Sequence, residues 1–176
     1  DATNKDTDIS YLNSETTYLR LDSAIAPISD KRVREALNMA IDREAFVGSL
    51  LPEGTVPAVA MVPPTTLGWN PDVKEYPYDP EKAKELLAAA KADGVPVDTP
   101  LHLIGRSNLF PGVTEVTEAL QQMLQDVGFT VDVQMVEVAQ QEELYSKPFK
   151  DGRPPQMLFV SHDNAKGDPV FSMFFK

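Results

Sequence analysis

The chain has 176 residues, a formal net charge of −11 and no cysteine. This length suits one domain with a core of its own, and its 42% apolar and 24% charged residues are ordinary for a soluble globular chain. The acidic balance argues against nucleic acid or an anionic membrane surface as the partner, because phosphates are bound by clustered Lys and Arg. The lack of cysteine excludes disulfides and thiolate metal sites. No apolar run approaches the roughly 20 residues that span a bilayer, and the polar first residues show no signal-peptide pattern.

The first elements in chain order are a strand and a helix. Residues 1 to about 15 are polar, and we expect them to be frayed. The segment near 18–22 predicts a strand. Apolar residues then recur at helical spacing from Val33, which predicts a helix near 33–46 with Asp30 as the cap of its first turn.

A long loop and a second helix come next. Residues 52–79 hold many prolines, two glycines and Trp69, without periodicity. A loop of this length is unusual in a compact domain, so it is either a functional surface or a packed wrapping segment. Asp79 and Pro80 are typical of the cap and the first position of a helix, which we expect to end near Asp93 and Gly94.

The second half of the chain alternates strands with helices. Its pattern predicts strands near 101–104, 130–136 and 157–160, a helix over 113–127 that Gly128 ends, and a short helix over 139–145. The last residues, near Phe171, Phe174 and Phe175, are apolar, and the chain stops while it is still in an apolar segment. This abrupt end suggests a piece of a longer protein.

The order of strands and helices favours an α/β fold in which the four predicted strands share one mixed sheet flanked by helices. Such sheets bind ligands in the crevice outside the carboxyl ends of their strands. Two loops qualify, Gly105 to Gly112 after one strand and Ser161 to Pro169 after another.

Several segments in this order resemble one known family. Residues 34–43 read R-E-A-L-N-M-A-I-D-R, residues 78–87 read Y-D-P-E-K-A-K-E-L-L, and residues 63–69 read P-P-T-T-L-G-W. Residues 116–133 and 158–169 add a helix with its strand, and a strand with its loop. The set resembles the extracellular, or periplasmic, solute-binding proteins of the oligopeptide- and dipeptide-binding type, and the similarity covers nearly the whole chain from about Thr16.

This resemblance implies a periplasmic-binding-protein fold of type II, of which the chain, residues 1–176, would be most of the second lobe alone. The N-terminal lobe would be missing. The implied function is capture of a small extracytoplasmic solute, most often a short peptide, and its delivery to an ABC permease in the membrane. The implied protein is periplasmic or otherwise extracytoplasmic, is not an enzyme and needs no cofactor.

The resemblance also indicates candidate binding residues. An Asp in the last loop of peptide-binding members takes the α-amino group of the ligand, and an Arg after the middle strand can take its carboxylate; the equivalents here are Asp163 and Arg106. The full set of candidates comprises Trp69, Arg106, Ser107, Asn108, Phe110, His162 and Asp163. From the residues alone, simpler roles stay open: Ser107 or Asn108 as a helix cap, Asp163 as a turn residue, and Trp69 as the anchor of its loop.

Other functions remain as alternatives. A binding protein for a sugar, an opine-like conjugate or a chelated metal such as nickel would use the same two-lobed design. His162, Asp163 and Asp168 have side chains that suit zinc or nickel, although a resident metal is not expected. A hydrolase that uses two carboxylates and a pure interaction module are the alternatives from other classes, but the chain shows no nucleophile elbow, phosphate-binding glycine loop or zinc-protease helix.

Overall fold

The computed structural model describes residues 15–145, 149 and 151–163. The expected frayed start, the apolar end from Phe171 to Phe175 and the candidate metal ligand Asp168 lie outside this part of the chain. Within it, no helix is long and apolar enough to cross a membrane.

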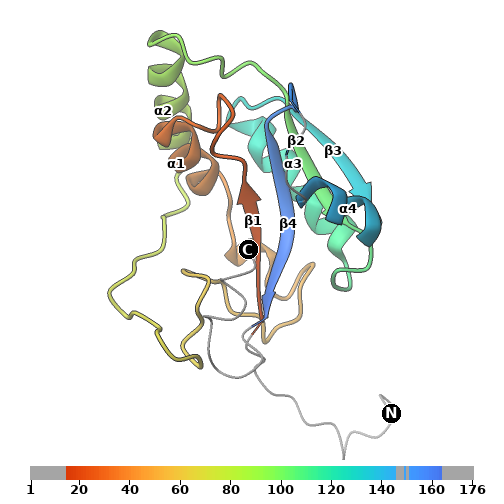
Figure 1. Ribbon diagram of the computed structural model, residues 1–176. Coiled ribbons are helices and arrows are strands. Elements are labelled where there is room, and N and C mark those ends of the chain that lie inside the picture. The colour runs from red at the N-terminus through yellow and green to blue at the C-terminus, as the bar shows by residue number, and fades with distance from the viewer. Residues whose placement is uncertain (1–14, 146–148, 150, 164–176) are drawn as a thin grey trace, which may run out of the picture.

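Four strands form one mixed sheet, as the sequence predicts (Figure 1). They are β1 (Glu15–Leu21), β2 (Leu101–Arg106), β3 (Val131–Val136) and β4 (Gln156–Asp163). Their spatial order is β1-β4-β2-β3, with β1 antiparallel to β4 and with β2 parallel to both β3 and β4. The carboxyl ends of β2, β3 and β4 therefore meet at one edge of the sheet, which is also where β1 begins.

Two neighbouring helices begin where their capping residues predict. The carboxylate of Asp30 accepts from the backbone N–H of Arg32 at 2.8 Å at the start of α1 (Lys31–Met39). The carboxylate of Asp79 accepts from Lys82 N–H at 2.9 Å at the start of α2 (Pro80–Ala92). The two helices pack side by side next to β1 (Figure 1).

The predicted helix over 33–46 is wrong beyond Met39, where α1 ends; a single 3-10 turn follows at Glu44–Phe46. The physical reason lies in the side chain of Arg43, which folds back and donates to the carbonyl of Asn38 at 3.3 Å and to its side-chain oxygen at 3.0 Å. The first of these bonds satisfies a backbone carbonyl that a continuing helix would have used.

The third helix has the predicted bounds within one residue. It is α3 (Val113–Asp126), and Gly128 ends it with φ of 107°, a backbone conformation that glycine adopts without strain. The amide side chain of Gln121 donates to the carbonyl of Val131 at 2.8 Å, so α3 is bonded to the start of β3.

The main core lies between one face of the sheet and helices α1, α2 and α3. Alternate strand residues face it, among them Leu101 and Leu103 of β2 and Met157 and Phe159 of β4. The other face carries a smaller cluster of Ile104, Val136, Leu158 and Val160. Leu144 of α4 (Val138–Tyr145) packs on that cluster.

The long Pro-rich segment, residues 52–79, carries no regular element. Its end is bonded to α1, because the N–H of Asp79 donates to the carbonyl of Met39 at 2.9 Å. Most of the exposed large apolar side chains in the described part belong to it, including Leu67, Trp69 and Tyr78. It is thus an exposed surface segment, and in Figure 1 part of it lies at the level of the carboxyl end of β4.

The cap of α1 gives a pH-dependent prediction. Hydrogen bonds from Arg32 lower the pKa of Asp30, so the carboxylate stabilises the fold above its ordinary pKa of about 3.9 and this contribution disappears as the pH falls through the lowered value. We expect Asp30→Ala to lower the free energy of unfolding by about 0.5–2 kcal/mol at neutral pH. In chemical denaturation this difference should shrink in acid; the exposed Asp132→Ala serves as the control, and a loss for Asp30→Ala that stays constant down to acid pH would contradict the assignment.

Candidate functional site

The candidate site lies at the edge where β2, β3 and β4 end. The loop after β2, residues 107–112, is fixed against its surroundings on two sides. The N–H of Ser107 donates to the carbonyl of Val136 at the end of β3, at 2.9 Å. The ring of Phe110 meets the ring of Phe159 edge to face, with centroids 6.0 Å apart. The loop is therefore held in one conformation by backbone and core contacts.

Asn108 marks the most unusual backbone in this loop. It is exposed and has φ of 59°, the only positive φ of a non-glycine residue in the described chain. Asn tolerates this left-handed conformation better than most residues. Gly112, with φ of 83°, leads into α3, and a side chain there would meet the carbonyl of Leu50 at 3.2 Å. The loop therefore packs closely against the segment that precedes the Pro-rich segment.

Arg106 is the last residue of β2, so the strand runs two residues beyond the predicted end at Ile104 and the loop begins only at Ser107. Its side chain is half-buried, and its Nε atom is inaccessible to solvent with no hydrogen-bond partner within the described residues. A buried N–H without an acceptor costs free energy, and an anionic acceptor relieves that cost best. Arg106 is therefore suited to hold a carboxylate.

The end of β4 also differs from the prediction. The strand continues to Asp163, so the loop expected from Ser161 begins later, because β4 pairs with the whole length of β1 and Glu15 lies opposite Asp163. His162 is thus a strand residue and is fully buried. Thr16, its neighbour across the pair, is buried as well.

Arg106 and Asp163 lie on neighbouring strands at the same edge. Ile104 of β2 pairs with Leu158 of β4; Arg106 lies two residues beyond that pair and Asp163 lies five residues beyond it. The backbone of Asp163 therefore extends about 10 Å past that of Arg106, at roughly 3.3 Å per strand residue. That spacing is comparable to the length of a short extended peptide.

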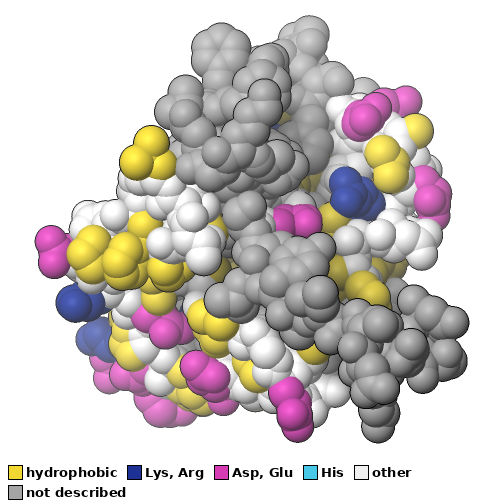
Figure 2. Space-filling view, turned by 90° about the horizontal axis from the view of Figure 1, so that it is seen from below, with side chains coloured by type: hydrophobic (Ala, Val, Ile, Leu, Met, Phe, Trp, Pro, Cys, Tyr) yellow, Lys and Arg dark blue, Asp and Glu magenta, His cyan; other side chains and the backbone are white. Residues whose placement is uncertain are grey.

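Trp69 belongs to the Pro-rich segment, and 38% of its surface is exposed. Figure 2 looks onto the strand-end face from below and shows apolar side chains on the left, the side on which the Pro-rich segment lies in Figure 1. The structure does not bring Trp69 into contact with Arg106 through any hydrogen bond or ring contact of the described residues.

Tyr18 lies on β1, three residues after the strand begins at this edge. On β1, burial raises the pKa of Tyr18, and the charge of Arg20 opposes the shift. Tyr18 is therefore a neutral phenol at physiological pH. Within the described residues no three His, Asp or Glu side chains gather as a metal site would require.

Sequence reasoning missed two features of this region. The contact of Gly112 with Leu50 joins segments about sixty positions apart. In the sequence, only the Pro-Gly pair before α3 indicates a turn at this place. The buried pairing of Thr16 with His162 joins the start of β1 to the end of β4 and has no local signal at all.

Comparison with known proteins finds a family whose model matches nearly the whole chain. A family model described as bacterial extracellular solute-binding proteins, family 5 Middle, matches residues 1–175. Di/tripeptide-binding protein 2 of Pseudomonas aeruginosa is 31% identical over 156 residues, which are 88% of this chain and 28% of that protein. Heme-binding protein A of Haemophilus influenzae is 40% identical over 73 residues, 42% of this chain and 13% of that protein.

A solved structure shows the same fold. The periplasmic binding protein DppA from Helicobacter pylori, in complex with the peptide STSA, superposes with a TM-score of 0.76 at 22% identity, covering 93% of this chain and 30% of that one. The mixed sheet with its helices is thus an α/β arrangement of the type II periplasmic-binding-protein kind. The chain spans less than a third of the length of these relatives.

Proposed function

Because the chain belongs to the bacterial extracellular solute-binding proteins of family 5, we propose that it is one lobe of a two-lobed receptor. In this proposal the receptor captures a short extracytoplasmic peptide and delivers it to an ABC permease. The relatives named for di- and tripeptide binding support this choice of ligand. The match covers only 28% of one such relative, and this greater length of the relative supports a second lobe outside this chain.

The observation that carries the proposal is the buried Nε of Arg106 at the carboxyl end of β2, which has no hydrogen-bond partner among the described residues. In the proposed complex the carboxylate of the peptide accepts from Arg106, and its α-amino group meets Asp163, about 10 Å away along the strand direction. An offset of three strand positions puts Arg106 and Asp163 on alternate faces of the sheet, so the zwitterion has to cross the strand-end edge for each terminus to meet a complementary charge. Ser107, Asn108, Phe110 and Trp69 are the further candidates for this surface, whereas His162, predicted from the sequence as a further contact, is fully buried in this lobe.

The mechanism is capture followed by closure. A two-lobed receptor buries its ligand from both sides, and closure of the hinge completes the contacts and selects the loaded form for the permease. No covalent chemistry is needed, and the proposed role is not enzymatic. Another solute remains the second candidate, because a stretch of this chain is 40% identical to a protein named for heme binding.

A thermal-shift experiment on the longer, two-lobed protein tests this proposal. Any ligand that binds only the folded state raises the melting temperature in a concentration-dependent way. We expect short peptides with free termini to raise the melting temperature. Blocked peptides, sugars, heme and nickel chelates should raise it less. Stabilisation by one of those other solutes alone would overturn the peptide assignment, and turnover of a peptide would overturn the binding role.

Substitutions at the edge test the two proposed charge contacts directly. In the longer protein, we expect Arg106→Gln and Asp163→Ala each to weaken a peptide by about 1–3 kcal/mol, because each leaves one charged terminus unpaired in a desolvated site. Calorimetry measures the loss. Lys91→Gln, an exposed residue of α2, is the matched control and should leave the affinity unchanged; equal effects at Lys91 and Arg106 would exclude a direct contact.

A further inference from the structure

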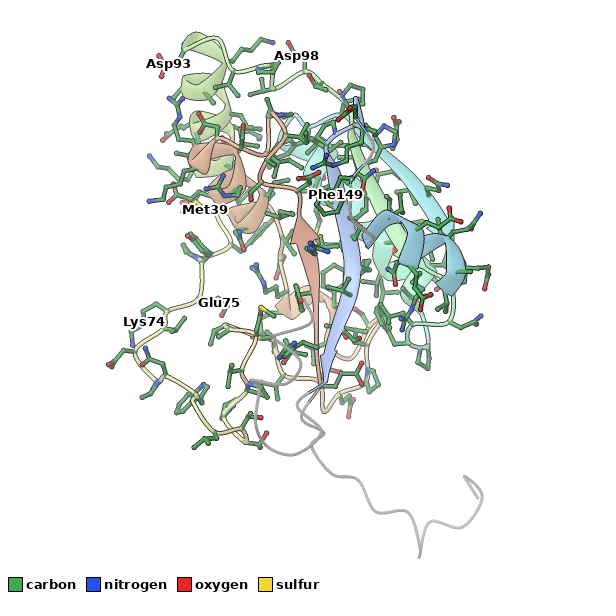
Figure 3. The ribbon with its side chains drawn as sticks, viewed as in Figure 1. Met39, Lys74, Glu75, Asp93, Asp98 and Phe149 are labelled. Atoms are coloured by element: carbon green, nitrogen blue, oxygen red, sulfur yellow. The ribbon has the colours of Figure 1, made fainter. Side chains whose placement is uncertain are left out.

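A second concave site lies at the opposite end of the sheet from the candidate peptide edge. It is a pocket of about 310 Å³ at the end of β1 and the start of β4, next to the end of α4. Figure 3 shows Phe149, one of its lining residues, on the side of the sheet where α4 lies. The seven residue steps of β4 separate this end from Asp163 by roughly 23 Å, so the pocket is independent of the proposed peptide site.

The pocket combines an apolar floor with a charged wall. Leu144 of α4, Leu158 of β4 and the ring of Phe149 supply the floor. The guanidinium of Arg153 lies over the Phe149 ring, 4.6 Å from its centroid, so the apolar and charged parts are joined in one unit.

An ion pair forms the wall. Arg153 Nε donates to Asp22 Oδ2 at 2.7 Å and Nη2 donates to Oδ1 at 3.3 Å, with only 19% and 17% of the two side chains exposed. Arg20 is the third charged residue of the lining. Arg20 is engaged in an interaction of its own, so among the described lining residues Arg153 is the guanidinium that we consider for a ligand.

We propose that this pocket binds a small monocarboxylate with an apolar body. Guanidinium groups match carboxylates in shape and charge, and a half-buried arginine is less screened than a surface lysine. Asp22 accepts from Nε and Nη2 of Arg153. Nη1 is therefore the donor that we assign to the carboxylate of the ligand. The volume is at the lower end of the range for small-molecule sites and suits a body of about ten heavy atoms.

The test uses the 176-residue chain and phenylacetate as the probe. In amide nuclear magnetic resonance spectra, phenylacetate should shift the signals of Leu21, Asp22 and Gln156 with saturation in the millimolar range. Phenethylamine, which has the same ring and the opposite charge, should shift them far less. Equal shifts from the two probes, shifts confined to residues near Arg106, or no shift at about 20 mM would overturn the proposal.

Two variants locate the charge. Arg153→Gln should weaken phenylacetate by about tenfold, because it removes a charge-assisted hydrogen bond. Asp22→Asn keeps the shape of the side chain and removes the competing carboxylate, so it should strengthen phenylacetate several-fold. If Arg153→Gln does not fold, Asp22→Asn decides: weaker or unchanged binding of phenylacetate by that variant would overturn the assignment. Neither variant touches the peptide edge, so its affinity for peptides should not change.

Discussion

Leu103→Ala should lower the free energy of unfolding by about 2–5 kcal/mol, the largest loss we expect from a single substitution in this chain. Leu103 is fully buried in β2, which lies between β3 and β4, and it faces the main core. The loss contains the free energy of transfer of the removed methyl groups and the cost of the cavity that the rigid sheet cannot close. Chemical denaturation followed by circular dichroism measures it.

Leu67→Ala is the matched control for this experiment. The chemical change is the same, but Leu67 is 74% exposed in the Pro-rich segment, so its loss should lie within about 0.5 kcal/mol. A loss at Leu67 as large as that at Leu103 would show that the Pro-rich segment, rather than the sheet, provides the core.

Gly105→Val should lower the free energy of unfolding by about 1–3 kcal/mol through overpacking. A Cβ at Gly105 would clash with Sδ of Met135, lie 2.9 Å from its Cε and lie 3.2 Å from Oγ1 of Thr117. Thr117 cannot yield easily, because its hydroxyl donates to the carbonyl of Val113 in the first turn of α3. Gly54→Val is the control, since nothing lies within 4 Å of a side chain there.

A second substitution separates the two clashes. Met135→Ala removes Sδ and Cε, so the double variant Gly105→Val/Met135→Ala should recover part of the loss of Gly105→Val in a double-mutant cycle. Simple addition of the two losses would mean that the contact with Met135 is not the cause. Because Gly105 precedes Arg106, the same variant tests whether this packing also sets the position of the arginine, read as peptide affinity in the longer protein.

The elements that were predictable from the sequence are those with local signals. Asp30, Asp79 and Gly128 each act on backbone groups within about four residues, so the capping rules apply to them directly. Of the strands, β3 was predictable because apolar and polar residues alternate along it, and β4 because its apolar residues form a short continuous run.

The boundaries that the sequence did not predict depend on distant or unusual contacts. The early end of α1 follows from the fold-back of Arg43 onto Asn38, which competes with an otherwise helical pattern. The extension of β4 through His162 and Asp163 follows from pairing with β1, about 147 positions earlier in the chain. No window of neighbouring residues contains that information.

The candidate site was predictable from the sequence only in part. The rule that ligands bind at the carboxyl ends of strands pointed to the two loops near Arg106 and Asp163, and the resemblance to the family singled out these two residues. The second pocket depends on Asp22 and Arg153, which lie 131 positions apart and meet only in the folded chain. Neither residue stands out in its own segment.

The most direct test of the central claim, that the edge formed by the ends of β2 and β4 is half of a peptide site, is a titration of the 176-residue chain with a dipeptide, followed by amide nuclear magnetic resonance. We expect shifts at residues 106–110 and 160–163 and a dissociation constant no better than about 1 mM, roughly −4 kcal/mol, because half a site leaves the other side of the ligand hydrated. The same dipeptide with both termini blocked should produce no shifts there. Micromolar affinity would contradict the half-site, and shifts confined to other residues would contradict the edge.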